Sequence, residues 1–293
     1  VNTIEFILNQ SIRMQYLSLL LLTSLALSRH CALSAIVSET LYSHGDNAAI
    51  RYHYDDLMSS YVCETVVMMV VGTGMSQDDY ETLSTNISTK QPIITVIVDH
   101  FPGFFLKSNP KKFARAYEQF MEAIQTGNIV PICKGRAPKK VLIGGHSTGA
   151  VAALGAFAEL NPRPDGFIGL DPFSVDEKKV SLAEDTPALL WGFKEMTCQV
   201  KIQQAAKAAY NLSSKKHRIF YRANNADGSF KHCDFTTHGC GSACPLGGDG
   251  SLVPQVAKSI QSFVRAVKKG SFPRDRFILD DTNTIDLFMN EED

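Results

Sequence analysis

Apolar runs of strand length alternate along the chain with stretches of helix length. Residues 65–71, 93–98 and 141–144 are continuous apolar runs, and each is followed at once by glycine or aspartate. A run without polar alternation predicts a strand buried on both faces, which is typical of parallel sheets. Residues 112–126 carry apolar side chains at helical spacing, and 149–160 is rich in alanine. The first half therefore predicts strands covered by helices.

The same rhythm continues through the second half of the chain. Strand-like runs at 166–170, 187–192 and 218–221 are separated by longer segments, and residues 252–269 are typical of a closing helix. Strands that alternate with helices indicate a parallel sheet with helices on its faces. We predict an α/β fold with a mainly parallel central sheet flanked by helices.

The N-terminal region has the pattern of a secretory leader. Arg13 precedes an apolar run over residues 16–27, which is short for a membrane span but suits the core of a signal peptide. We expect an N-terminal extension with a signal peptide over residues 1–35. A catalytic domain over 36–272 and a loose acidic tail over 273–293 would follow. This organisation predicts entry into the secretory pathway, with secretion, the endoplasmic reticulum or a plastid as the destination.

The cysteines agree with an oxidising compartment. An even number behind a signal peptide predicts up to three disulfides, although the sequence does not fix their pairing. Asn86 and Asn211 each begin a glycosylation sequon. The six cysteines after the leader are Cys63, Cys133, Cys198, Cys233, Cys240 and Cys244.

Residues 145–149, Gly-His-Ser-Thr-Gly, match the pattern G-x-S-x-G. A predicted strand stands directly before them and a predicted helix directly after. In a nucleophile elbow the serine occupies a sharp strand-to-helix turn, which requires small neighbours such as Gly145 and Gly149. The helix N-terminus also directs free amides at the reacting centre. The context predicts that Ser147 is a nucleophile; an ordinary glycine-rich turn is the alternative.

A serine nucleophile needs a carboxylate and a histidine, which follow it in that order in this type of fold. Asp171 comes directly after the strand that ends at Leu170, and Pro172 stops that strand. Active sites of open parallel sheets form at such carboxyl ends. We predict Asp171 as the acid. Glu195, after the next strand, is the alternative, and a structural role for Asp171 is another.

The general base is expected in the loop after the last predicted strand. His232 and His238 both lie there, and we predict His232, with His238 as the alternative. His146 is a poor candidate, because the side chain before the nucleophile should point away from it. The same loop region could instead bind zinc. However, Cys240-x3-Cys244 lacks a second Cys/His pair, and a secretory chain favours disulfides, so we predict no metal.

The oxyanion formed during acyl transfer needs two backbone amides. One is expected from Thr148, the residue after the nucleophile. The other is expected from Thr73, which lies between Gly72 and Gly74 after the strand at 65–71. The flanking glycines would allow this loop to approach a substrate closely.

Four segments together resemble one known family. Residues 71–80, the elbow at 145–149, Gly-Leu-Asp-Pro at 169–172 and His-Cys-Asp at 232–234 are similar to chlorophyllases and their dienelactone-hydrolase and cutinase-like relatives. The similarity spans roughly residues 60–270. It implies an α/β-hydrolase fold and hydrolysis of chlorophyll to chlorophyllide and phytol, with no metal or organic cofactor.

The resemblance also implies site residues. Asp171 lies in a motif like the family's Leu/Ile-Asp-Pro, and His232 lies in a similar His-x-Asp context. Three departures bear on the substrate. Val71 stands where the family has histidine before the glycine, Thr148 where plant enzymes carry arginine, and Ala150 where the family has glycine.

The expected function is therefore that of a serine carboxylic-ester hydrolase that acts on a hydrophobic ester. Peripheral contact with a membrane is a further possible interaction. A general lipase or esterase, a polyester hydrolase and an acyltransferase use the same residues. A hydrolase-fold binding protein would lack activity. Lysine and arginine (29) nearly balance aspartate and glutamate (30), and the basic residues are scattered, so no nucleic-acid partner is expected.

Overall fold

The computed structural model describes most of the chain after the predicted leader. Its described residues are 36–42, 49–58, 62–99, 109–130, 133–173, 182, 185–194, 205–213, 216–224, 230–238, 248–280 and 284–289. The predicted signal peptide and the alternative acid Glu195 lie outside them. None of the described helices is long and apolar enough to cross a membrane.

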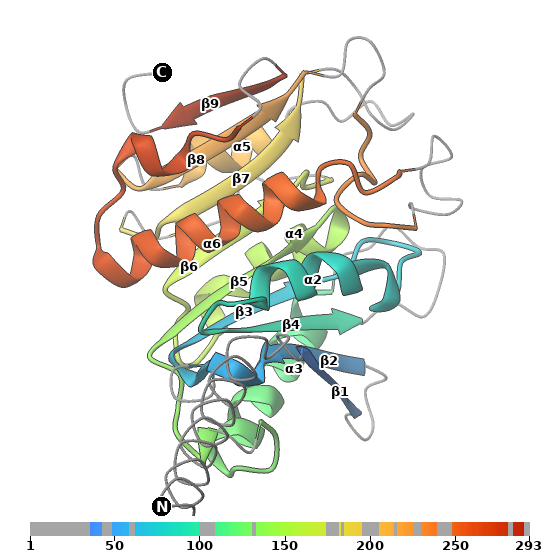
Figure 1. Ribbon diagram of the computed structural model, residues 1–293, viewed down its shortest axis with the longest axis vertical. Helices are drawn as coiled ribbons and strands as arrows, with labels where there is room; N and C mark the ends of the chain where they lie inside the picture. The colour runs from blue at the N-terminus through green and yellow to red at the C-terminus, as the bar shows by residue number, and fades with distance from the viewer. Residues whose placement is uncertain are drawn as a thin grey trace, which may run out of the picture. The chain divides into compact units, whose positions relative to one another are not determined.

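Nine strands form one sheet in the order β1-β2-β4-β3-β5-β6-β7-β8-β9 (Figure 1). The six strands from β4 to β8 in this order are mutually parallel, whereas β1, β2 and β9 pair antiparallel at the two edges. This confirms the predicted α/β fold with a mainly parallel sheet. The strands are β1 (Ile36–Tyr42), β2 (Ala49–Asp55), β3 (Thr65–Val70), β4 (Ile93–Asp99), β5 (Lys140–His146), β6 (Gly166–Leu170), β7 (Ala188–Phe193), β8 (Arg218–Ala223) and β9 (Ile285–Met289).

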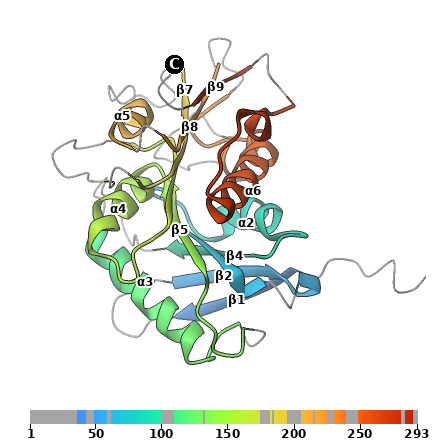
Figure 2. The same cartoon turned by 90° about the vertical axis from the view of Figure 1, so that its left-hand side faces the viewer.

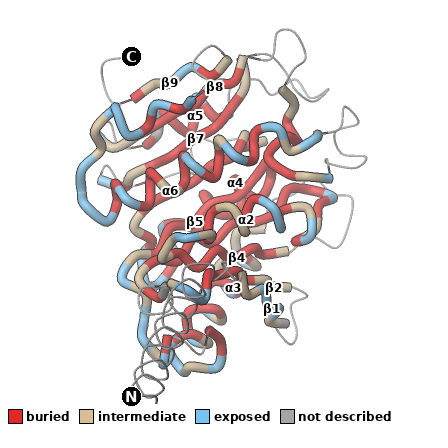
Figure 3. The backbone as a smooth tube through the Cα atoms, in the orientation of Figure 1, coloured by how far each residue is buried: buried red, intermediate tan, exposed pale blue. Residues whose placement is uncertain are grey.

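Helices cover both faces of this sheet. Figure 2 shows α3, α4 and α5 on one face and α2 and α6 on the other. Each face has its own apolar core, and alternate residues of β3 contribute to each: Val66 and Met68 to one, Val67 and Met69 to the other. The burial of entire strands explains their unbroken apolar runs (Figure 3). The helices are α2 (Glu81–Ser88), α3 (Pro110–Gln125), α4 (Thr148–Ala156), α5 (Ala205–Leu212) and α6 (Val253–Lys269).

The prediction of a loose tail from residue 273 is wrong for the segment that forms β9. Ile285 and Met289 are buried, and the strand pairs antiparallel with β8. Asp286 forms an ion pair of 2.7 Å with Arg222, and Phe288 stacks on Phe220. The acidic composition of this segment hides a short strand whose apolar residues pack on the sheet.

A disulfide joins the segment before β3 to the segment before β5. Cys63 and Cys133 form this bond across 70 residues, and both are buried. Cys233 is also disulfide-bonded, and the other cysteine of that bond lies outside the described residues. The prediction of disulfides is confirmed for Cys63 and Cys133, which tie together the starts of two adjacent parallel strands.

Replacing Cys63 and Cys133 together by alanine should lower the free energy of unfolding. A cross-link over a loop of this length stabilises a protein by about 4 kcal/mol, mainly by restricting the unfolded chain. Urea unfolding of the oxidised wild type and the double variant measures the difference. Equal midpoints for the two proteins would show that the bond adds nothing to stability.

Candidate active site

Ser147 occupies the turn between β5 and α4, alone between the last residue of the strand and the first of the helix. Its backbone has φ 55° and ψ −125°, a region that residues with a side chain rarely adopt. Such a conformation costs about 1–3 kcal/mol and persists only where the surroundings impose it. Ser147 is 7% exposed. The turn therefore has the strained geometry expected of a nucleophile elbow.

Two glycines allow this turn because other backbone crosses them closely. A Cβ on Gly149 would lie 2.3 Å from the carbonyl oxygen of Val70 and 2.4 Å from that of Val71. A Cβ on Gly145 would lie 2.6 Å from the carbonyl carbon of Gly149. No side chain fits at these distances, so the G-x-S-x-G pattern follows from the packing of α4 against β3.

Asp171 and His232 form a close pair. The Nδ1 of His232 donates to the Oδ2 of Asp171 at 2.6 Å. Because the carboxylate holds the proton of Nδ1, the Nε2 atom is left with a lone pair, as a general base requires. His232 is 6% exposed, and Asp171 stands directly after β6 with φ 39°. The two residues chosen from strand order are thus in contact.

Backbone contacts bring this pair to the elbow. The N–H of Ser147 donates to the carbonyl of Leu170 at 3.0 Å, and the N–H of Phe173 donates to the carbonyl of Ser147 at 3.2 Å. These two bonds flank Asp171. In addition, the His146 Nε2 is 2.9 Å from the carbonyl oxygen of His232. Ser147 is therefore held beside the segment of Asp171, and its neighbour His146 is bonded to the main chain of His232.

The two residues predicted for the oxyanion hole contact each other. The Oγ1 atoms of Thr73 and Thr148 are 2.7 Å apart, and both residues are buried. A Cβ on Gly72 would lie 3.3 Å from the Cβ of Ser147, so this loop packs against the elbow. Within the described ranges, neither the Thr73 nor the Thr148 amide donates to a protein acceptor. Both amides are thus available to an oxygen that becomes negatively charged.

The alternative base, His238, lies elsewhere. The side chain of His238 is 68% exposed, and its Nδ1 is 3.8 Å from Asp79 rather than near Asp171. Asp234, next but one to His232, accepts from the amides of Lys231 and Asp249, and its burial raises its pKa. Among the described residues no group of metal-binding side chains could hold an ion, while Cys240 and Cys244 fall outside them.

Sequence reasoning missed two buried polar side chains beneath the site, Tyr80 and His146. The ring of His146 lies against the ring of His232, with centroids 4.5 Å apart. Burial, and then the neighbouring His232, lowers the pKa of His146 well below its usual value. Tyr80 is 66 residues away in the chain, so no local signal links the two.

In comparisons with known proteins, no family model and no curated protein matches this chain. The chlorophyllase resemblance therefore rests on the motifs alone. The architecture itself, a nine-stranded, mainly parallel sheet covered by helices, is consistent with an α/β-hydrolase-like fold.

Replacing Thr73 by valine should slow the reaction of Ser147 with an electrophilic phosphonate about tenfold, because a donor that moves by about 1 Å can cost up to a hundredfold. The substitution removes the hydrogen bond between the hydroxyls of Thr73 and Thr148 and keeps the shape of the side chain. The second-order labelling rate measures this effect.

The matched control is Thr95→Val. Thr95 makes a similar buried hydroxyl contact, 2.8 Å to Ser88, but on β4 and away from the elbow. Its labelling rate should equal that of the wild type. Equal labelling rates for Thr73→Val and Thr95→Val would show that the contact between Thr73 and Thr148 does not affect the reactivity of Ser147.

Proposed function

We propose that this chain is a serine carboxylic-ester hydrolase, with Ser147 as nucleophile, His232 as general base and Asp171 as the residue that orients it. One observation carries the proposal. A serine in a strained strand-to-helix turn is bonded through its backbone to the segment of an aspartate that accepts from a histidine at 2.6 Å. An ordinary strand-to-helix turn would not require a serine with a strained backbone next to a hydrogen-bonded aspartate and histidine.

The first half of the reaction acylates the serine. The Nε2 of His232 takes the hydroxyl proton of Ser147 as its oxygen bonds to the ester carbonyl carbon. The carbonyl electron pair moves to the oxygen, where the amides of Thr73 and Thr148 stabilise the negative charge. Asp171 stabilises the imidazolium. When the intermediate collapses, the bond to the alcohol breaks, and the leaving oxygen takes the proton from His232.

The second half repeats these steps with water. His232 removes a proton from water as the oxygen bonds to the acyl carbon, and the serine oxygen leaves with that proton. The carboxylic acid is released and the enzyme is restored. Each proton that His232 accepts is returned within the same half-reaction, so none of these steps calls for an external acid, base or oxidant.

The substrate class comes from the resemblance to chlorophyllases. It favours an ester with a long hydrophobic alcohol, of which chlorophyll with its phytol is the family's example. The departures at Val71, Thr148 and Ala150 leave other lipid-like esters and polyesters as competitors. Backbone amides serve as the oxyanion donors, so these side-chain differences bear on what is bound rather than on the bond that is cleaved.

The wild type should hydrolyse at least one ester in a panel of chlorophyll, short p-nitrophenyl esters, triacylglycerol and a polyester film. We expect the highest kcat/KM for chlorophyll. Ser147→Ala should lose about 10⁴-fold or more on every active substrate, since loss of a triad residue has that effect. Hydrolysis is measured as the release of chlorophyllide, nitrophenol or acid. Retention of more than about one per cent of activity by Ser147→Ala would refute the role of this serine.

Asp171→Asn tests the orientation of the base separately. An amide nitrogen in place of Oδ2 donates a proton, which favours the His232 tautomer that cannot accept from Ser147. We expect kcat to fall about 10⁴-fold at neutral pH while the variant stays folded. His238→Ala is the control, because that histidine is exposed and should leave kcat unchanged. If kcat fell for His238→Ala but not for Asp171→Asn, His238 rather than His232 would be the general base.

A further inference from the structure

The side chains of Tyr80 and His146 form a buried polar pair directly below the elbow. Both residues are 0% exposed, and the Tyr80 hydroxyl is 2.7 Å from the Nδ1 of His146. Each has a second partner in another part of the site. The Tyr80 hydroxyl is 3.0 Å from the amide nitrogen of Gly72, and the His146 Nε2 is 2.9 Å from the carbonyl oxygen of His232.

The direction of each hydrogen bond follows from what the end groups can do. The carbonyl of His232 can only accept, so the proton of His146 is on Nε2 and its Nδ1 is an acceptor. The hydroxyl of Tyr80 therefore donates to His146, and its oxygen accepts from the Gly72 amide. Met75 offers a sulfur 3.2 Å from the same hydroxyl, but a thioether is the weaker acceptor.

The result is one continuous relay: Gly72 N–H to Tyr80 O–H to His146, and His146 N–H to the His232 carbonyl. Every donor has an acceptor with a neutral imidazole. The strong burial that lowers the pKa of His146 keeps it in that form. One end of the relay holds Gly72, which precedes Thr73, and the other end holds the main chain of His232. His146, at its centre, directly precedes Ser147.

We propose that Tyr80 and His146 are positioning residues, which hold the oxyanion loop and the general base in register with the nucleophile. This inference rests on the proposed function. The relay connects three separate segments that must agree in position for acyl transfer, and misplacement by about 1 Å can reduce the rate a hundredfold. A buried pair of polar side chains gives directional bonds that an apolar pair of similar volume would lack.

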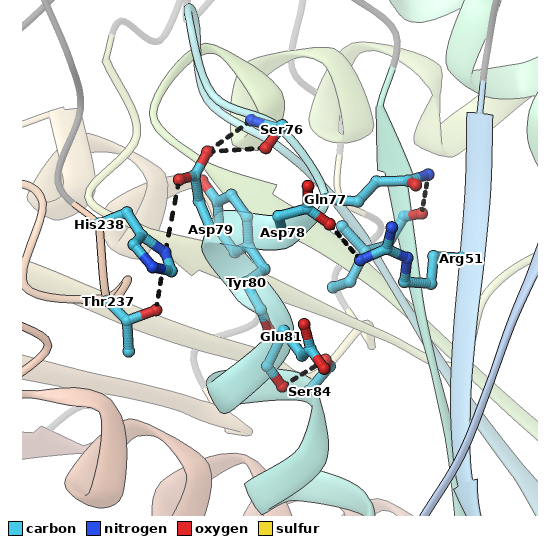
Figure 4. A network of polar contacts seen from close by, with 11 residues as sticks. Arg51, Ser76, Gln77, Asp78, Asp79, Tyr80, Glu81, Ser84, Thr237 and His238 are labelled. Carbon is cyan, nitrogen blue, oxygen red and sulfur yellow. Dashed lines mark hydrogen bonds and ion pairs between the residues drawn. The ribbon is translucent and has the colours of Figure 1, made fainter.

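The turn that carries Tyr80 makes a second connection between the same loops (Figure 4). The backbone carbonyl of Asp79 accepts from the amide of Thr237 at 3.3 Å, and its carboxylate accepts from the amide and hydroxyl of Ser76 at 2.7 and 3.1 Å. Thr237 lies five residues after His232. Asp79 thus ties the loop of the base to the oxyanion loop at the surface, while Tyr80 and His146 tie them in the interior.

Tyr80→Phe tests the relay by removing a single oxygen. The matched control is Tyr221→Phe, since Tyr221 is also buried and its hydroxyl makes one hydrogen bond, 2.6 Å to the carbonyl of Phe277, far along the chain from the site. Tyr80→Phe loses two buried hydrogen bonds and Tyr221→Phe loses one, so both melting temperatures should fall, and that of Tyr80→Phe should fall further. We expect kcat and the phosphonate labelling rate of Tyr80→Phe to fall about 10- to 100-fold with KM nearly unchanged. Tyr221→Phe should keep the kcat of the wild type.

The outcomes separate the relay from the proposed function. A wild type whose Ser147 reacts with no phosphonate and cleaves no ester would refute the function itself. An active wild type with equal kcat for Tyr80→Phe and Tyr221→Phe would overturn the relay alone.

His146→Asn repeats the test if Tyr80→Phe fails to fold. Asparagine keeps an acceptor near the position of Nδ1 but is too short to donate to the His232 carbonyl. The same loss of kcat at unchanged KM is expected for this variant. Wild-type kcat in a folded His146→Asn would overturn the relay as well.

Discussion

The close crossing of α4 over the end of β3 is the constraint on which the rest of the site depends. Backbone meets backbone at Gly149, where a Cβ would lie 2.3 Å from a carbonyl oxygen. At this crossing the strand passes into the helix through one residue, Ser147, whose backbone has the strained combination of φ 55° and ψ −125°. The strain is offset by the burial of the strand and the helix on both sides, whose side chains fill the two cores. The serine is thus presented at the carboxyl edge of the sheet without a dedicated loop.

The central sheet could be predicted because parallel strands are buried on both faces, which gives continuous apolar runs such as β3 and β4. The strands at the edges of the sheet could not be predicted in this way. In β2, Ile50 and Tyr52 face one core, while Arg51 and His53 alternate with them on the other face. The polar positions break the run, and burial lowers the pKa of His53 to about 4. The helices α2 and α5 were not predicted either, since each has only eight residues, which is about two turns of helical pattern.

The site was predictable to the extent that strand ends determine it. The order of the strands and the loop after the last one predict Asp171 and His232, which are in contact in the structure. The roles of Tyr80 and His146 could not be read in this way. Besides each other, their partners are the backbone amide of Gly72 and the backbone carbonyl of His232, and contacts to the main chain leave no residue pattern. Only the packing of the η3 turn (Asp78–Tyr80) below the elbow reveals them.

The strand β9 has a consequence for the behaviour of shortened chains. The parallel part of the sheet would end at β8, whose N–H and C=O groups on one side are satisfied by residues 285–289. An unpaired apolar edge is a template for pairing with a second molecule. A chain cut before Ile285 would therefore keep the strained turn at Ser147 yet tend to self-associate through β8. Strand β9 thus covers a sheet edge that a second molecule could otherwise pair with.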